Sequence, residues 1–107
     1  MELRLVLTTI GNEKDAERVA KLVVESGLAA CVNVIPVTFS VYRWKGKLEK
    51  EPELLLLMKT PADRVSDLKS KLKEIHPYET PEIVELAASA VTEGYLAWVV
   101  EATRGIS

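Results

Sequence analysis

The chain has 107 residues, of which 48% are hydrophobic, so it is long enough for one domain with a packed core and too apolar for extended disorder. Its 14 basic and 16 acidic residues give a net charge of -2, and no stretch gathers the basic excess that a nucleic-acid backbone requires. We therefore expect a single domain over residues 1–107 that does not bind nucleic acid.

No apolar run approaches the roughly 20 residues of a membrane span, and residues 1–4 lack the pattern of a secretory signal. The only cysteine, Cys31, cannot form an internal disulfide, so the sequence gives no sign of an oxidising compartment. These features favour a soluble cytoplasmic protein without membrane contact.

The first third of the chain predicts a strand and a helix. Leucines alternate over residues 3–7, as in a mostly buried strand. Asn12 is a candidate N-cap with Asp15 in the first turn, and Gly27 is a stop signal. Between them, apolar residues recur at helical spacing: Ala16, Val19, Ala20, Val23 and Val24.

Residues 28–44 are rich in β-branched, aromatic and small apolar types, which predicts a long strand that is bent or bulged near Pro36. Lys45 and Gly46 predict a tight reversal. The apolar run 54–58 that follows is typical of a strand buried on both faces.

A second helix is predicted from residue 61, with Thr60 as its N-cap and Pro61 at its first position. A fourth strand is predicted over residues 83–91, and a C-terminal helix then places Tyr95, Trp98, Val99 and Ala102 on one face. The order βαββαβ with an added helix predicts an α+β, ferredoxin-like sandwich.

The predicted strand 28–44 is too long for one compact domain. Fully extended, it would span about 55 Å, whereas a domain of this size has a radius of gyration of about 13 Å. Its outer end carries Phe39, Tyr42 and Trp44, and an exposed aromatic hairpin favours pairing with another chain. We expect a homo-oligomer. Alternatively, Pro36 breaks the segment and the aromatics pack in the chain's own core.

Residues 76–83, His-Pro-Tyr-Glu-Thr-Pro-Glu-Ile, hold the only histidine between two regular elements. Each proline biases the residue before it away from the helical region, so the segment has a defined, extended course. A site for a small ligand or metal should include this segment.

Several blocks in the same order over nearly the whole chain resemble the CutA family of divalent-cation-tolerance proteins. They are GLAACVNVIP at 27–36, SVYRWKGK at 40–47, Lys59-Thr60, the histidine segment and YLAW at 95–98. Residues 86–94 depart from the usual pattern, because the proline that commonly follows the leucine is absent.

The resemblance implies a ferredoxin-like protomer in a tight homotrimer held by strand pairing, similar in architecture to the PII signalling proteins. It also implies a role in tolerance to copper and other divalent metals, with copper(II) or another divalent ion bound weakly and no organic cofactor. Which metal is physiological does not follow from the residues.

The metal-ligand candidates are His76, Glu79, Glu82 and Cys31. None belongs to a paired ligand spacing, so a site with three or four ligands would need several of them or another subunit. Alternatively, His76 is a helix-terminal residue whose charged form the helix dipole favours, and Cys31 simply packs.

Catalysis has little support, because the chain lacks a nucleophile elbow and a phosphate loop, and we expect no enzyme. A cleft between subunits could still assemble dispersed groups, namely His76, Tyr78, Glu79, Glu82, Lys59 and Asn33. Two other functions stay open: a PII-like regulator that binds a small anion near Lys45 and Lys47, and a scaffold for a partner protein.

Overall fold

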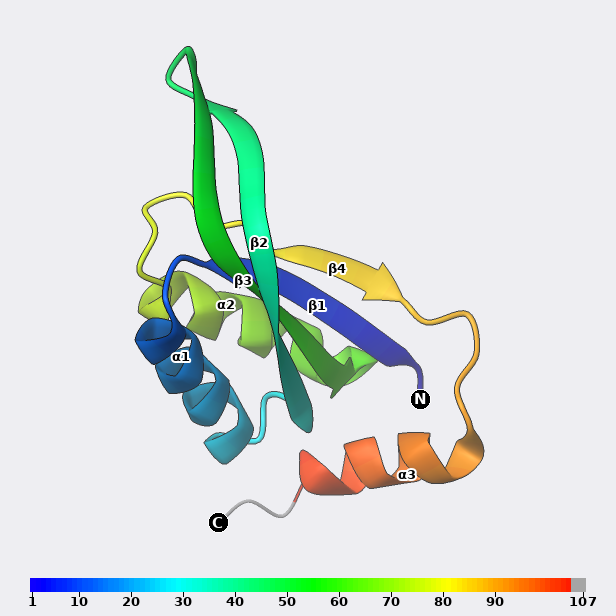
Figure 1. The fold of residues 1–107 in the computed structure, drawn as a ribbon. Coiled ribbons are helices and arrows are strands. Elements are labelled where there is room, and N and C mark those ends of the chain that lie inside the picture. The colour runs from blue at the N-terminus through cyan, green and yellow to red at the C-terminus, as the bar shows by residue number, and fades with distance from the viewer. Residues whose placement is uncertain (105–107) are drawn as a thin grey trace.

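A computed structural model describes residues 1–104, and its element order confirms the predicted βαββαβ pattern with an added helix. The elements are β1 (Leu3–Ile10), α1 (Glu13–Glu25), β2 (Cys31–Trp44), β3 (Lys47–Pro61), a short 3-10 turn (Ala62–Arg64), α2 (Val65–Ile75), β4 (Val84–Ala87) and α3 (Glu93–Ala102). One antiparallel sheet has the strand order β2-β3-β1-β4, with α1 and α2 over the same face (Figure 1). No helix within residues 1–104 has the length and hydrophobicity needed to cross a bilayer.

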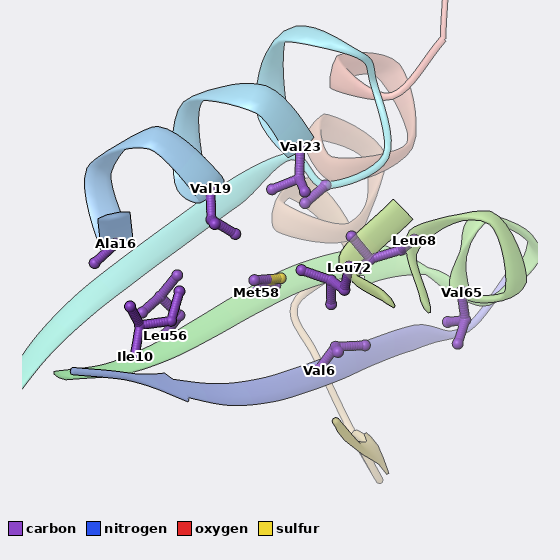
Figure 2. Packing of buried hydrophobic residues seen from close by; sticks show 11 residues of the cluster. Val6, Ile10, Ala16, Val19, Val23, Leu56, Met58, Val65, Leu68 and Leu72 are labelled. Carbon is purple, nitrogen blue, oxygen red and sulfur yellow. The ribbon is translucent and has the colours of Figure 1, made fainter. Parts of the chain in front are cut away.

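The main core lies between this face of the sheet and the two helices, as Figure 2 shows. Alternate residues of β1 and β3 point into it, because a strand turns every second side chain to the same face. Apolar residues at helical spacing on α1 and α2 form the other side of this core. Its fully buried members include Val6, Ile10, Val19, Val23, Leu56, Met58, Leu68 and Leu72.

The first helix begins and ends as predicted. The Asn12 side chain accepts a hydrogen bond of 2.8 Å from the backbone N–H of Asp15, which satisfies one of the free donors of the first turn. Gly27 follows the helix with φ of 72°, a left-handed conformation that glycine adopts without steric cost.

The β2–β3 hairpin projects beyond the rest of the domain (Figure 1). Lys45 and Gly46 form its turn with φ of 50° and 80°, the left-handed pair that a two-residue hairpin turn requires. Phe39, Tyr42 and Trp44 stay 45%, 40% and 44% exposed. The alternative that these aromatics pack in the chain's own core is therefore wrong.

The irregularity in β2 lies just after the predicted position. Pro36 still pairs with Leu54 in register, and the register shifts between Val37 and Ser40. This bulge is where β2 leaves the body of the sheet to enter the projecting part of the hairpin.

The second helix does not begin at Thr60. Strand β3 continues to Pro61, because Thr60 and Pro61 still pair with Arg4 and Leu3 of β1. The Thr60 hydroxyl donates a hydrogen bond of 2.7 Å to the Leu28 carbonyl instead of capping a helix. Sheet pairing thus overrides a local capping signal, and α2 begins only at residue 65.

The fourth strand is also shorter than predicted. It ends at Ala87, because its antiparallel partner β1 begins only at Leu3. Ala87 pairs with Arg4, and the Ala88 amide donates a last hydrogen bond of 3.2 Å to the Leu3 carbonyl. The chain then turns into α3, whose Val99 packs on Leu3 and Ala30 in a second, smaller core.

The apolar run 54–58 is not buried on both faces within one chain. Leu56 and Met58 are fully buried under the helices, whereas Leu55 and Leu57 point to the other face and are only half-buried. We call this second side the open face of the sheet. Its apolar residues come from all four strands: Leu5, Leu7, Ile35, Leu55, Leu57, Val84 and Leu86.

Candidate functional site

His76 is the C-cap residue directly after α2 and fixes the start of the segment 76–82. Because Pro77 disfavours helical geometry at His76, the residue is extended, with φ of -68° and ψ of 136°. Its buried ring returns to β1, where Nε2 lies 2.9 Å from Thr8 Oγ1 and 3.0 Å from the Thr9 carbonyl oxygen. The Tyr78 amide donates to Nδ1 at 3.0 Å.

These contacts determine which tautomer the neutral imidazole ring of His76 adopts. Nδ1 accepts a hydrogen from the Tyr78 amide, so in the neutral ring the proton is on Nε2, which donates to the Thr9 carbonyl. Both ring nitrogens are therefore engaged within the chain. A metal ion could bind either nitrogen only by displacing one of these hydrogen bonds.

Burial lowers the pKa of His76 below its ordinary value of 6.5, and Arg18 lowers it further. The Thr9 carbonyl and the carboxylates of Glu53 and Asp15 oppose the shift only in part. Burial is the largest cause of the lowered pKa of His76, and it acts against the charged form that the helix end was expected to favour. The expected position at the helix end is confirmed, but only the hydrogen bond from the Tyr78 amide is local, because the other partners of the ring, Thr8 and Thr9, lie on β1.

Tyr78 extends from the histidine segment to the hairpin. Its ring centroid lies 4.9 Å from that of His76, and its hydroxyl donates a hydrogen bond of 2.9 Å to Glu53 Oε2 on β3. The hydroxyl passes close to Gly11, where a Cβ atom would lie 3.0 Å from the phenol oxygen. Glycine at position 11 leaves room for this contact.

A cleft of about 650 Å³ lies between the hairpin and the segment after α2. Hairpin residues form one wall, the histidine segment forms the other, and Thr9 of β1 contributes between them. The lining residues are Thr9, Ser40, Val41, Tyr42, Trp44, Glu53, Tyr78, Glu79, Thr80 and Glu82.

The cleft is acidic. Three carboxylates line it, from Glu53, Glu79 and Glu82, and no lysine or arginine is among the lining residues. Burial raises the pKa of Tyr78 well above its ordinary value of 10, and the hydrogen bond to Glu53 raises it further. The pKa of Tyr42 is raised by burial and then by neighbouring carboxylates. Both phenols thus report a local environment that disfavours added negative charge.

The structure brings together some of the predicted metal ligands and separates others. Glu79 and Glu82 line the cleft, whereas His76 is directed away to β1. Cys31 pairs with Lys59 at the start of β2, at the opposite end of the strand from Trp44. Within residues 1–104, no group of three or more His, Cys, Asp or Glu side chains is arranged to hold a metal ion.

Two of the other candidates for a cleft lie outside it. Lys59 Nζ lies 3.8 Å from Cys31 Sγ, so the neighbour of this lysine is a thiol at the start of β2. Asn33 pairs with Leu57 on the open face of the sheet. Neither residue lines the cleft.

Glu53 is the one acidic residue among the cleft residues that sequence reasoning missed, which also include Thr9, Ser40 and Val41. It directly precedes the apolar run of β3 and carries no motif that would single it out. Its place opposite Tyr78 depends on the register of β3 and on the course of a segment 25 residues later. Tyr42 and Trp44 were identified as exposed aromatics, but not as the wall of a cleft.

A family model described as CutA1 divalent ion tolerance protein matches residues 4–102. The chain belongs to the CutA family. The divalent-cation tolerance protein CutA of Thermus thermophilus is 44% identical over 99 residues, which make up 92% of this chain and 96% of that protein. Mouse protein CutA is 42% identical over 99 residues, covering 92% of this chain. The chain spans only 56% of the mouse protein and 55% of the human one.

Solved CutA structures have the same fold. The CutA of Xylella fastidiosa matches with a TM-score of 0.92 and 34% identity, over 96% of this chain and 99% of that one. A CutA of Archaeoglobus fulgidus, described as a periplasmic divalent cation tolerance protein, matches with a TM-score of 0.91 and 30% identity, over 95% and 99%. The proteins of Thermus thermophilus and Archaeoglobus fulgidus are thus named for tolerance to divalent cations.

Proposed function

We propose that this CutA chain contributes to tolerance of copper or other divalent metal ions as a homotrimer that binds the ion weakly. Membership of the CutA family supports the role in tolerance. The open face of the sheet supports the assembly, and the carboxylates of the cleft support weak metal binding. A cytoplasmic location remains a prediction.

The open face is the observation that favours assembly. Val84 and Leu86 on β4 are 43% and 48% exposed, and Ile35 on β2 is 41% exposed. Together with the half-buried leucines of β1 and β3 they form an apolar surface that continues across the sheet. An apolar surface of this kind is typical of an interface between chains.

The two sheet edges favour strand pairing as the means of assembly. In the order β2-β3-β1-β4, strands β2 and β4 each have one side without a strand partner in the described chain. The projecting hairpin carries its β2 edge beyond the domain, where it can reach the β4 edge of a neighbour (Figure 1). A head-to-tail contact of this kind closes into a ring when the rotation between neighbours permits it, and the trimer we propose is such a ring.

Glu79 and Glu82 are the chain's best candidates for metal contact. Both are exposed carboxylates of the histidine segment, and both line the cleft. Two carboxylates alone make a weak site, so water or another subunit would complete the coordination. His76 would act by holding the segment in place. Cys31, on the sheet, would take part only if a neighbouring chain supplied further ligands.

The anion-binding alternative has no support from the cleft. Lys45 and Lys47 lie at the tip of the hairpin and do not line it, whereas three carboxylates do. An anion would enter a region of negative charge. The cleft favours cations.

The role in tolerance is tested in a bacterial strain that lacks its own CutA and is grown at rising copper concentrations. The strain should regain tolerance with the wild-type chain and with Glu17→Gln, which removes a charge from the exposed side of α1. The double variant Glu79→Gln with Glu82→Gln should restore less. Equal growth with the double variant would overturn the assignment of these carboxylates, and no rescue by the wild type would overturn the role itself.

A further inference from the structure

His76 is a buried titratable group that the proposed metal binding does not use as a ligand. Only 7% of the residue is exposed. Nδ1 accepts a hydrogen bond of 3.0 Å from the Tyr78 backbone N–H, and Nε2 lies 3.0 Å from the Thr9 carbonyl oxygen on β1. The ring therefore joins the start of the segment after α2 to the sheet. All of these contacts lie within one chain, so they do not require an exposed hairpin or an exposed open face.

This pair of contacts requires a neutral ring. A neutral imidazole has one donor and one acceptor nitrogen, and here the Tyr78 amide occupies the acceptor while the Thr9 carbonyl occupies the donor. In the protonated ring both nitrogens are donors, so an N–H on Nδ1 would point at the N–H of Tyr78. A buried donor without an acceptor is costly. Protonation must therefore break the contact between the ring and the Tyr78 amide.

Charged groups act on the ring from α1 and β3, whereas its two contacts on β1, a hydroxyl and a carbonyl, do not titrate. Arg18 on α1 donates a hydrogen bond of 3.1 Å to the last carbonyl of α2, and its charge acts against a second cation. Asp15 on α1 and Glu53 on β3 favour a cation, but Asp15 lies 3.6 Å from Arg18, and Glu53 accepts the Tyr78 hydroxyl. Burial is the largest effect, and the pKa of His76 is lowered below 6.5.

Tyr78 transmits a change at the ring to the rest of the segment. Its backbone N–H is held by His76, and its hydroxyl donates a hydrogen bond of 2.9 Å to Glu53 on the hairpin. No helix or strand forms between the end of α2 at residue 75 and the start of β4 at residue 84. The segment is therefore not held by a backbone ladder of its own, and Glu79 and Glu82 lie within it.

We propose that His76 is a pH-sensitive switch whose neutral ring holds residues 77–82 against β1 and whose protonation releases them. The released ring has an ordinary pKa of 6.5, so the released form binds more protons than the closed form below that pH. The segment is thus held at neutral pH and let go in acid, where Glu79 and Glu82 lose their fixed positions. This inference concerns the course of the segment and does not rest on metal binding.

Hydrogen exchange of the Tyr78 amide, followed by NMR in the assembled protein, measures the release. Rates at pH 7.5 and 5.5 are corrected for the intrinsic pH dependence of amide exchange. One unit below 6.5, a released ring is protonated about ten times more often than not, so the protection of this amide should fall several-fold, at most about tenfold. The Ala30 amide, which bonds to the Lys59 carbonyl at 2.9 Å, should keep its protection.

His76→Gln is the matched variant. A glutamine side chain has an oxygen that can accept from the Tyr78 amide and a nitrogen that can donate to Thr9, but it does not titrate. The protection of the Tyr78 amide in this variant should be the same at both pH values. Glu53→Gln removes the carboxylate beside Tyr78 and keeps an acceptor for its hydroxyl, so the fall in protection should remain.

The proposal is overturned if the protection of the Tyr78 amide does not fall in the wild type, or if it falls equally in His76→Gln. Light scattering at both pH values follows the assembly. A mass that falls with the protection in both proteins would attribute the exchange to dissociation and would also overturn the proposal. Because EDTA is present throughout, a failure of the proposed metal binding leaves all of these results unchanged.

Discussion

The hydroxyl of Tyr78 donates a hydrogen bond of 2.9 Å to the carboxylate of Glu53, and this bond connects the segment after α2 to the hairpin. The two residues lie 25 positions apart, on opposite walls of one cleft. His76 helps to hold Tyr78 in position, because its Nδ1 accepts a hydrogen bond from the Tyr78 backbone N–H. The geometry of the cleft therefore depends on two linked hydrogen bonds, between His76 and Tyr78 and between Tyr78 and Glu53.

Replacing Tyr78 by phenylalanine should remove the hydrogen bond to Glu53 and keep the ring. The free energy of unfolding should fall by about 1 kcal/mol, the usual net value of one hydrogen bond. Urea denaturation at one fixed protein concentration measures the change. Tyr42→Phe is the control, because the Tyr42 hydroxyl makes no hydrogen bond with a described residue, and an equal loss in both variants would contradict the assigned role of the bond.

Because the chain has a single histidine, the effect of its titration on the free energy of unfolding can be measured without interference from other imidazoles. Because burial lowers the pKa of His76 in the folded state, the unfolded chain binds more protons in the interval between the folded pKa and 6.5. The contribution of His76 to the free energy of unfolding should therefore be fully present above pH 6.5. It should fall as the pH decreases through this interval and level off below the pKa of the folded state. An NMR titration of the imidazole should show a midpoint below 6.5.

His76→Gln separates this effect from the titration of carboxylates at lower pH. The variant has no group that titrates as a histidine, so its free energy of unfolding should change less between pH 7 and the folded pKa. A midpoint at or above 6.5, or an identical pH profile in the variant, would show that the ring is not held neutral by burial.

Gly11→Ala should disturb the cleft through Tyr78. The added Cβ atom would lie 3.0 Å from the Tyr78 hydroxyl oxygen, so the phenol must shift and its bond to Glu53 must weaken. We expect a loss of about 1 kcal/mol in urea denaturation, the lower end for overpacking, because the contact is at the surface. Gly94→Ala, with no atom within 4 Å of its Cβ, should be neutral or stabilising; the reverse order of stability would refute this account.

A charge on the open face should break the assembly. Leu86→Glu places a carboxylate on the exposed edge strand β4, and light scattering should show a mass below that of the wild-type protein, for which we propose a trimer. Val24→Glu on α1 is the control, because Val24 is similarly exposed but lies on a helix outside the proposed interface. An assembly of the same mass in Leu86→Glu as in the wild type would contradict assembly through this face.

Local signals predicted the parts of the fold that depend on local physics. The Asn12 cap, the left-handed Gly27 and the Lys45-Gly46 turn were all predicted from residue chemistry and confirmed. The start of α2 was mispredicted, since Thr60 has the chemistry of a cap and only its pairing with Arg4 shows that it belongs to a strand.

The cleft was predicted only in part, for a similar reason. The segment 76–83 could be identified from its prolines and its histidine, and it does form one wall. Glu53 could not be identified, because its position opposite Tyr78 follows from strand register and not from any local pattern. The direction of the His76 ring likewise depends on Thr9, which is 67 residues away.

Calorimetric titration of copper(II), with zinc for comparison, tests the central claim most directly. It is made on reduced wild-type protein, on the double variant Glu79→Gln with Glu82→Gln, and on Glu17→Gln, after light scattering has shown equal masses. The account predicts weak, saturable binding in the wild type and in Glu17→Gln that is lost in the double variant. Equal binding in all three proteins, or no binding in any, would contradict a metal site at the histidine segment.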